Sequence, residues 1–117
     1  MHLSNCTPHR IILFTPRGPL HLPTGDHPAR LLDEPGAQHI PLGLPVPVHE
    51  RTFGTTIDGL PHPHPATFYI VSRAVAAACP DRDDLLVPGP LVVSPPHGVA
   101  GCAVLYRFRR PQRASTE

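Results

Sequence analysis

Proline occupies 18 of the 117 positions and recurs between short apolar runs along the chain. Proline lacks a backbone N–H donor and disrupts the interior of a helix, so a chain interrupted this often cannot form long helices. The prolines do not gather in one low-complexity block, which favours many short strands and turns. We therefore expect an α+β fold that is predominantly β, with a small antiparallel or mixed sheet or partial barrel and one short helix.

The expected helix spans about residues 73–79, in the run "SRAVAAACP". Ser72 suits the N-cap position, because its side chain can accept a hydrogen bond from the first turn. A helix of about two turns is not stable alone in water. We expect packing of Val75, Ala78 and Cys79 to hold it in place.

Turn signals divide the rest of the chain into short extended segments. The run "RIILFTPRGPLHLP" predicts two strands joined by a turn at residues 16–18, where proline presets φ and glycine suits the last position. We expect one β-rich domain over residues 1–108 and a flexible polar tail over 109–117. The final strand is expected to be the longest. The expected strands are 10–15, 19–22, 29–33, 46–53, 67–71, 85–87, 91–94 and 99–108.

The charge balance argues against a dedicated nucleic-acid-binding protein. Ten basic and nine acidic residues leave a formal net charge of +1, whereas phosphate contacts along a duplex need a strongly basic face. The basic ending alternates Arg107 and Arg109 with Tyr106 and Phe108. This alternation fits an ordinary half-buried edge strand, so nucleic acid is not the partner we expect.

The cysteines and apolar runs indicate a cytoplasmic setting. Three widely spaced cysteines form no CxxC motif, and the first ten residues lack the apolar region of a secretory signal. No apolar run approaches the ~20 residues that cross a bilayer, so we expect no membrane partner. We expect Cys79 and Cys102 to be buried free thiols. Cys6 has no base near it in sequence that would make it a nucleophile.

Nine histidines raise the question of a metal site. His62 and His64 alternate with prolines, and a polyproline II conformation would turn their side chains to different sides. Neither an HExxH motif nor paired cysteines occur, so we expect no metal and no cofactor. His9 follows Thr7 just before the first expected strand. Thr7 either satisfies a neighbouring backbone group or forms, with His9, a polar rim near the run "PDRDD".

The helix start and the run "PDRDD" are the two candidate anion-binding regions. Unpaired N–H groups in a first helical turn, together with the guanidinium of Arg73, suit a phosphate or carboxylate. Ser72 as an ordinary cap, with Arg73 in water, is the alternative. At residues 80–84, Asp81 and Asp84 fit a turn in which carboxylates accept backbone N–H bonds. The alternatives are an Arg82–Asp83 wall for an anionic ligand and a catalytic carboxylate pair.

The order of several short motifs resembles a family of small proteins from bacteriophages, prophages and actinobacterial genomes. The motifs are "CTPH", "RTFG" with "GLP", "FYIVSRAVAAACPDRDDLLVPGPLV" and a closing "GC", over residues 7–102. The resemblance implies a genomic setting and no mechanism. The chain departs from the family pattern at "SPPHG", which replaces a short charged hairpin.

These features predict a small non-enzymatic binding protein for an anionic, nucleotide-like molecule, with a phage-type sequestering or accessory role. A weak core in a chain of this size also favours a homo-oligomer. A small hydrolase with an Asp/His pair and a structural or virion interaction protein are the alternatives. The candidate ligand-binding residues are Thr7, His9, Ser72, Arg73, Arg82 and Asp83.

Overall fold

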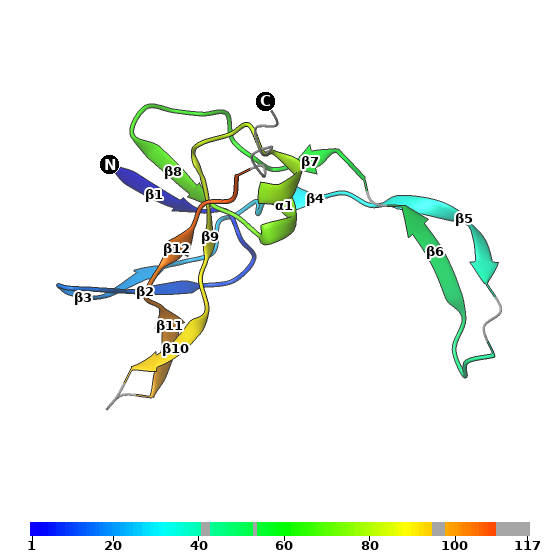
Figure 1. The fold of residues 1–117 in the computed structure, drawn as a ribbon, viewed down its shortest axis with the longest axis horizontal. Helices are drawn as coiled ribbons and strands as arrows, with labels where there is room; N and C mark the ends of the chain where they lie inside the picture. Colours follow the sequence, from blue (N-terminus) through cyan, green and yellow to red (C-terminus); the bar gives the residue numbers. More distant parts are fainter. Residues whose placement is uncertain (41–42, 53, 95–97, 110–117) are drawn as a thin grey trace, which may run out of the picture.

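A computed structural model describes residues 1–40, 43–52, 54–94 and 98–109 (Figure 1). These residues form short strands and one short helix, and the sheets are antiparallel or mixed and open. The expected α+β fold, predominantly β with one short helix, is thus confirmed. The expected tail lies outside the described residues from residue 110 onward.

The first sheet contains β1 (His2–Asn5), β8 (Thr67–Ile70), β9 (Leu85–Pro88) and β12 (Leu105–Tyr106), in that order. β8 is parallel to both β1 and β9, whereas β12 is antiparallel to β9. β1, β8 and β9 therefore begin at one edge of the sheet and end at the other. We call the side of the sheet where these three strands begin the amino edge, and the side where they end the carboxyl edge.

The second sheet has the order β10-β11-β2-β3 and lies next to the first (Figure 1). β2 (Ile11–Thr15) and β3 (Gly18–Leu22) form the expected opening hairpin, and Gly18 has a φ of 113° at its turn. β10 (Leu91–Ser94) and β11 (Val99–Cys102) form a second hairpin, which joins β2 through a parallel bridge.

The remaining strands form two small antiparallel pairs. β4 (Arg30–Leu31) pairs with β7 (Ile57–Asp58), close to the helix. β5 (Glu34–Ile40) pairs with β6 (Val48–Thr52), and this hairpin extends away from the two sheets as an arm (Figure 1). β1, β5 and β7 were not expected from the sequence, and β5, not the last strand, is the longest described strand.

The core consists of two clusters on the strands of the first sheet. One surrounds Tyr69, Val71 and Val75, and the other joins Ile70 to the second sheet at Ile11, Leu13 and Cys102. The helix α1 (Arg73–Ala78) buries Val75 and Ala76 in the first cluster. The expectation that Ala78 is a packing residue was wrong, since its side chain is exposed and Ala76 takes that place.

The expected strand 99–108 is divided in two. β11 ends at Cys102 in the second sheet, and β12 begins at Leu105 to pair with β9 in the first. The chain crosses between the sheets here, and the Gly89 N–H donates to the Val104 carbonyl at 3.0 Å. A Cβ at Gly89 would lie 2.8 Å from that oxygen, so the Pro-Gly-Pro break permits the crossing.

Candidate functional site

The carboxyl edge brings together segments that are far apart in the sequence. β1 is followed by the loop that carries Thr7 and His9, and β8 leads into Ser72 and Arg73. In open sheets with parallel strands, ligands bind outside the carboxyl ends of those strands. The parallel pairing of β1 with β8 is therefore what places four of the six sequence-predicted residues at one edge.

Asn5 and Thr7 fix the loop after β1. Asn5 Nδ2 donates to the His9 carbonyl at 2.8 Å and also reaches the Leu22 and Pro23 carbonyls at 3.2 Å. Asn5 Oδ1 accepts from the backbone N–H of Thr7 at 3.0 Å and from its hydroxyl at 2.7 Å. Both side chains are buried, and the network satisfies the polar groups of the loop. Thr7 thus satisfies neighbouring groups, as one of the two sequence interpretations proposed.

Ser72 and Arg73 lie at the start of α1. The Ser72 hydroxyl accepts from the Val75 N–H at 3.3 Å, which confirms the expected N-cap. The Arg73 guanidinium carbon lies 5.0 Å from the centre of the Phe108 ring. This cation–π contact engages the guanidinium group itself, at the tip of an exposed side chain, without neutralising its charge.

A cavity of about 530 Å³ lies between the carboxyl edge and the second sheet. Its walls are mostly apolar, with Ile11 and Cys102 from the core among them. Burial raises the pKa of the Cys102 thiol, whose Sγ donates to the Gly89 carbonyl at 3.5 Å. The cavity is lined by Thr7, Pro8, His9, Arg10, Ile11, Ile12, Val71, Ser72, Arg73, Val87, Pro88, Leu91, Ala100, Gly101 and Cys102.

The polar side chains of this cavity are basic or neutral. Arg10, Arg73 and His9 supply the basic groups, Thr7 and Ser72 supply hydroxyls, and no acid occurs among the lining residues that the structure describes. Among the described residues, Arg10 forms no ion pair. Two guanidinium groups beside an apolar hollow can receive an anion that also carries an apolar body.

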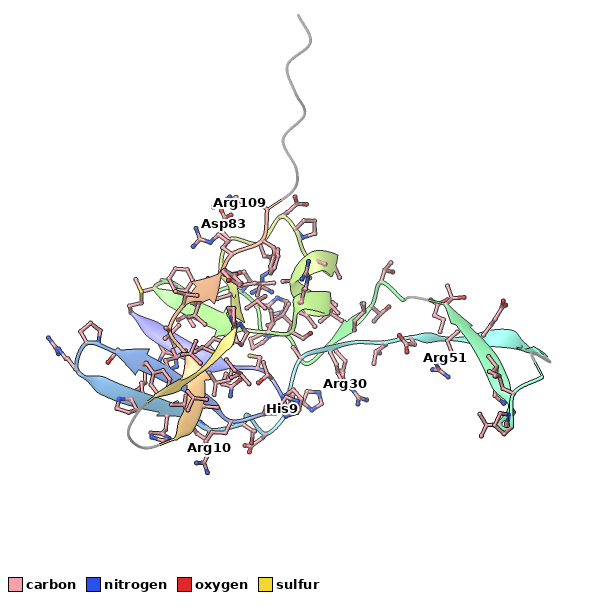
Figure 2. All side chains as sticks on the ribbon, turned by 60° about the horizontal axis from the view of Figure 1, so that its bottom comes forward. His9, Arg10, Arg30, Arg51, Asp83 and Arg109 are labelled. Atoms are coloured by element: carbon pink, nitrogen blue, oxygen red, sulfur yellow. The ribbon has the colours of Figure 1, made fainter. Side chains whose placement is uncertain are left out.

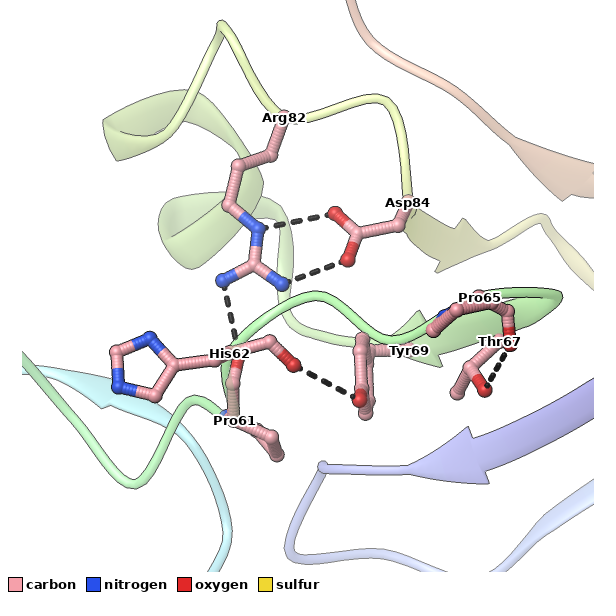
Figure 3. Close-up of polar contacts among 7 residues, drawn as sticks. All are labelled: Pro61, His62, Pro65, Thr67, Tyr69, Arg82 and Asp84. Carbon is pink, nitrogen blue, oxygen red and sulfur yellow. Dashed lines mark hydrogen bonds and ion pairs between the residues drawn. The ribbon is translucent and has the colours of Figure 1, made fainter.

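Arg82 lies at the amino edge and is engaged in the fold (Figure 3). Its Nε and Nη2 donate to the two oxygens of Asp84 at 2.9 and 2.7 Å, and its Nη1 donates to the Pro61 carbonyl at 3.0 Å. The Tyr69 hydroxyl donates to the His62 carbonyl at 3.1 Å beside it. The guanidinium therefore anchors the Pro-rich segment to the turn after α1.

This ion pair is largely shielded from solvent, with 21% of the Arg82 and 16% of the Asp84 side chain exposed. The hydrogen bonds from Arg82 hold the pKa of the Asp84 carboxyl below its usual value, although burial opposes them. Asp84 in turn raises the pKa of Arg82. The sequence interpretation of "PDRDD" as a turn had the carboxylates accept backbone N–H bonds, whereas both oxygens of Asp84 accept from the Arg82 side chain.

Asp83 points in a different direction. Its Oδ1 lies 3.3 Å from Nη1 of Arg109, in a pair whose side chains are mostly exposed. Figure 2 shows this pair on the opposite side of the body from His9 and Arg10. Neither Arg82 nor Asp83 lines the cavity. The alternative in which Thr7 and His9 form a rim near "PDRDD" does not fit, because these segments lie at opposite edges of the parallel strands.

Other sequence expectations have mixed outcomes. Cys102 is buried, but Cys79 is only partly buried. The regular strand ends at Tyr106, so Arg107 and Phe108 do not continue an edge strand. Arg107 instead contacts the Phe68 ring.

Within the described residues, no three His, Cys, Asp or Glu side chains are grouped as metal ligands would be. No described helix has the length and apolar character needed to cross a membrane.

Arg10 is the site residue that the sequence analysis missed. The signal was present, because Arg10 directly follows "TPH" and precedes the first apolar strand. A smaller hollow near Arg30 contrasts with the main cavity, since it carries the His27–Asp58 pair at 3.3 Å.

Comparison with protein-family models, with curated proteins and with solved structures finds no match to this chain. The resemblance to phage and actinobacterial proteins stays a prediction.

Proposed function

We propose that this protein is a small non-enzymatic binding protein, and that its ligand is a nucleotide-like anion held in the cavity at the carboxyl edge. One observation carries the proposal. The cavity combines Arg10 and Arg73 with apolar walls, and none of its described lining residues is acidic. An anionic group gains from both guanidinium groups there and meets no carboxylate that would repel it.

The shape and polarity of the cavity suit a molecule with two chemically different ends. Its volume of about 530 Å³ lies within the range typical of small-molecule sites. A phosphate would lie near Arg10 and Arg73, and a base would pack against apolar walls such as Val87 and Leu91. Such division of roles gives affinity through the apolar contact and orientation through the charged contact.

Binding without catalysis is favoured over hydrolysis by the state of the carboxylates. Both oxygens of Asp84 accept from Arg82, so this group is poorly suited to serve as a general base. Asp83 is paired with Arg109 on the surface. A sequestering or accessory role in a phage-like setting is part of the proposal and depends on the sequence resemblance alone.

Isothermal titration with ADP, adenosine and inorganic phosphate tests this proposal. We expect ADP to bind more tightly than either fragment, because only ADP engages both the basic groups and the apolar walls. Arg10→Gln and Arg73→Gln should each weaken ADP binding by about tenfold or more, the loss of one charge-assisted contact.

Arg17→Gln is the matched control, since it removes the same charge from an exposed turn outside the cavity. It should leave ADP affinity within about twofold of the wild-type value. Absence of ADP binding to the wild-type chain, or an equal loss in all three variants, would contradict binding in this cavity.

A further inference from the structure

The outer edge of β10 is an open hydrogen-bonding surface. β10 is the terminal strand of the second sheet, and among the described residues it pairs only with β11. In an antiparallel pair, alternate residues direct their N–H and C=O groups away from the partner strand. Half of the backbone polar groups of Leu91–Ser94 therefore point outward. Figure 1 shows the β10–β11 hairpin at the lower margin of the body.

The first three side chains of this strand are apolar and lie on both of its faces. Leu91 is 72% exposed and Val93 is 64% exposed on one face, and Val92 is 42% exposed on the other. Leu91 and Val93 lie opposite Cys102 and Ala100 of β11, so the core face of the sheet continues outward without a cover. Edge strands of monomeric proteins usually carry a charge or a proline that prevents pairing with another chain. The residues of β10 include neither.

The stretch of sequence around β10 also lacks charge. From Leu85 to Tyr106 the sequence contains no Asp, Glu, Lys or Arg. A charged partner segment would therefore find no complementary charge along this edge. In a twofold arrangement, by contrast, the strand faces a copy of itself. Any charged residue on it would then lie near the same residue of the other copy, which carries the same charge. The uncharged strand avoids this repulsion, which favours a second copy of the same chain over other occupants.

We propose that β10 pairs antiparallel with β10 of a second copy, so that the two second sheets join into one continuous sheet across a twofold axis. The outward N–H and C=O groups of one copy would bind those of the other. Val92 and Val93 would bury apolar surface against β10 of the other copy, one on each face of the joined sheet. This pairing does not depend on the proposed ligand.

Sedimentation velocity of the full chain tests the pairing, with a dimer expected for the wild type. Val93→Lys and Val92→Lys should each shift the chain to a monomer, because each places like charges across the twofold axis. Neither residue lines the cavity, so a failed pairing and a failed ligand site remain distinguishable. Circular dichroism and thermal unfolding would show that each variant is folded.

Two controls match these variants in exposure. Val46→Lys matches Val93→Lys, because Val46 is 63% exposed beside the arm. Leu20→Lys matches Val92→Lys, because Leu20 is 42% exposed on β3, the opposite edge strand. Both control variants should remain dimeric. In hydrogen exchange, the amides of residues 91–94 should gain protection as wild-type concentration rises.

Several results would overturn the proposal. A monomeric wild-type chain would exclude it, as would a dimer dissociated by Leu20→Lys or Val46→Lys but not by the β10 variants. A dimer sensitive to Val93→Lys alone would indicate contact through one sheet face and not through strand pairing. Should the lysine variants fail to fold, exchange of the 91–94 amides that is independent of wild-type concentration would overturn it instead.

Discussion

The amino edge and the carboxyl edge of the parallel strands both carry arginines, but the electrostatic surroundings of these arginines differ. At the amino edge, Arg82 forms two hydrogen bonds with Asp84, and Asp83 pairs with Arg109. At the carboxyl edge, Arg10 and Arg73 line a cavity whose lining, within the described part of the chain, includes no acidic residue. The first arrangement stabilises the fold, while the second leaves positive charge available for a ligand.

The difference shows that the arginine of a conspicuous charged motif can be fully engaged in holding the fold. "PDRDD" is the densest group of charges in the sequence, yet its arginine is occupied by its own neighbour and by the Pro61 carbonyl. The carboxyl-edge residues are less conspicuous because they are contributed by different segments. For choosing a candidate anion-binding site, whether an arginine already has a partner within the chain is therefore a better guide than the local density of charged residues.

Arg82→Met should produce the largest effect, at the amino edge. The variant leaves the shielded Asp84 without its donor and releases the Pro61 carbonyl, which should lower the free energy of unfolding by about 3 kcal/mol. Urea unfolding followed by circular dichroism measures this change. ADP affinity of the folded fraction should stay unchanged. A weakened affinity with unaltered stability would reverse the roles assigned to the two edges.

Acid should destabilise the wild-type chain through the same ion pair. The folded-state pKa of Asp84 is below the ordinary value of about 3.9, so its contribution is present above that value. The contribution is lost as pH falls through the folded-state pKa. Urea unfolding between about pH 6 and pH 2 should therefore show a shallower loss of stability for Asp84→Asn than for the wild type. Equal slopes would mean that Asp84 is not stabilised by Arg82.

Local features of the fold could be predicted from the sequence because short-range chemistry determines them. Ser72 caps α1 as expected, and the turn before Gly18 joins the expected hairpin. β1 and β7 were missed because each is short and depends on a partner strand far along the chain. The division of the last strand depends on two different sheets, which sequence periodicity does not reveal.

The candidate site could be predicted in part for the same reason. Thr7, His9, Ser72 and Arg73 were each identified from local patterns, but their meeting depends on the parallel pairing of β1 with β8. Sequence reasoning left open whether the Thr7 segment lies near "PDRDD" because it could not determine strand direction. Parallel and antiparallel pairing put the same loop at opposite edges.

Ser72→Asp should weaken the contrast between the edges by adding a carboxylate to the cavity. Aspartate caps a helix about as well as serine, so the free energy of unfolding should change little. The new negative charge among Arg10 and Arg73 should lower ADP affinity by about tenfold, or about 1.4 kcal/mol. Ser72→Asn is the control, because it keeps a capping side chain without the charge. Equal losses in both variants would show that charge is not the cause.

Asp83→Asn should have the smallest effect, although it removes a charge from the same run as Asp84. The Asp83 side chain is 79% exposed and its partner Arg109 is 63% exposed, so water screens their interaction. Such pairs contribute at most about 1 kcal/mol, and urea unfolding should show a loss no larger than this. ADP affinity should not change, since Asp83 lies away from the cavity. A large loss of affinity would mean that the amino edge also contributes to the ligand site, and the distinction between the two edges would fail.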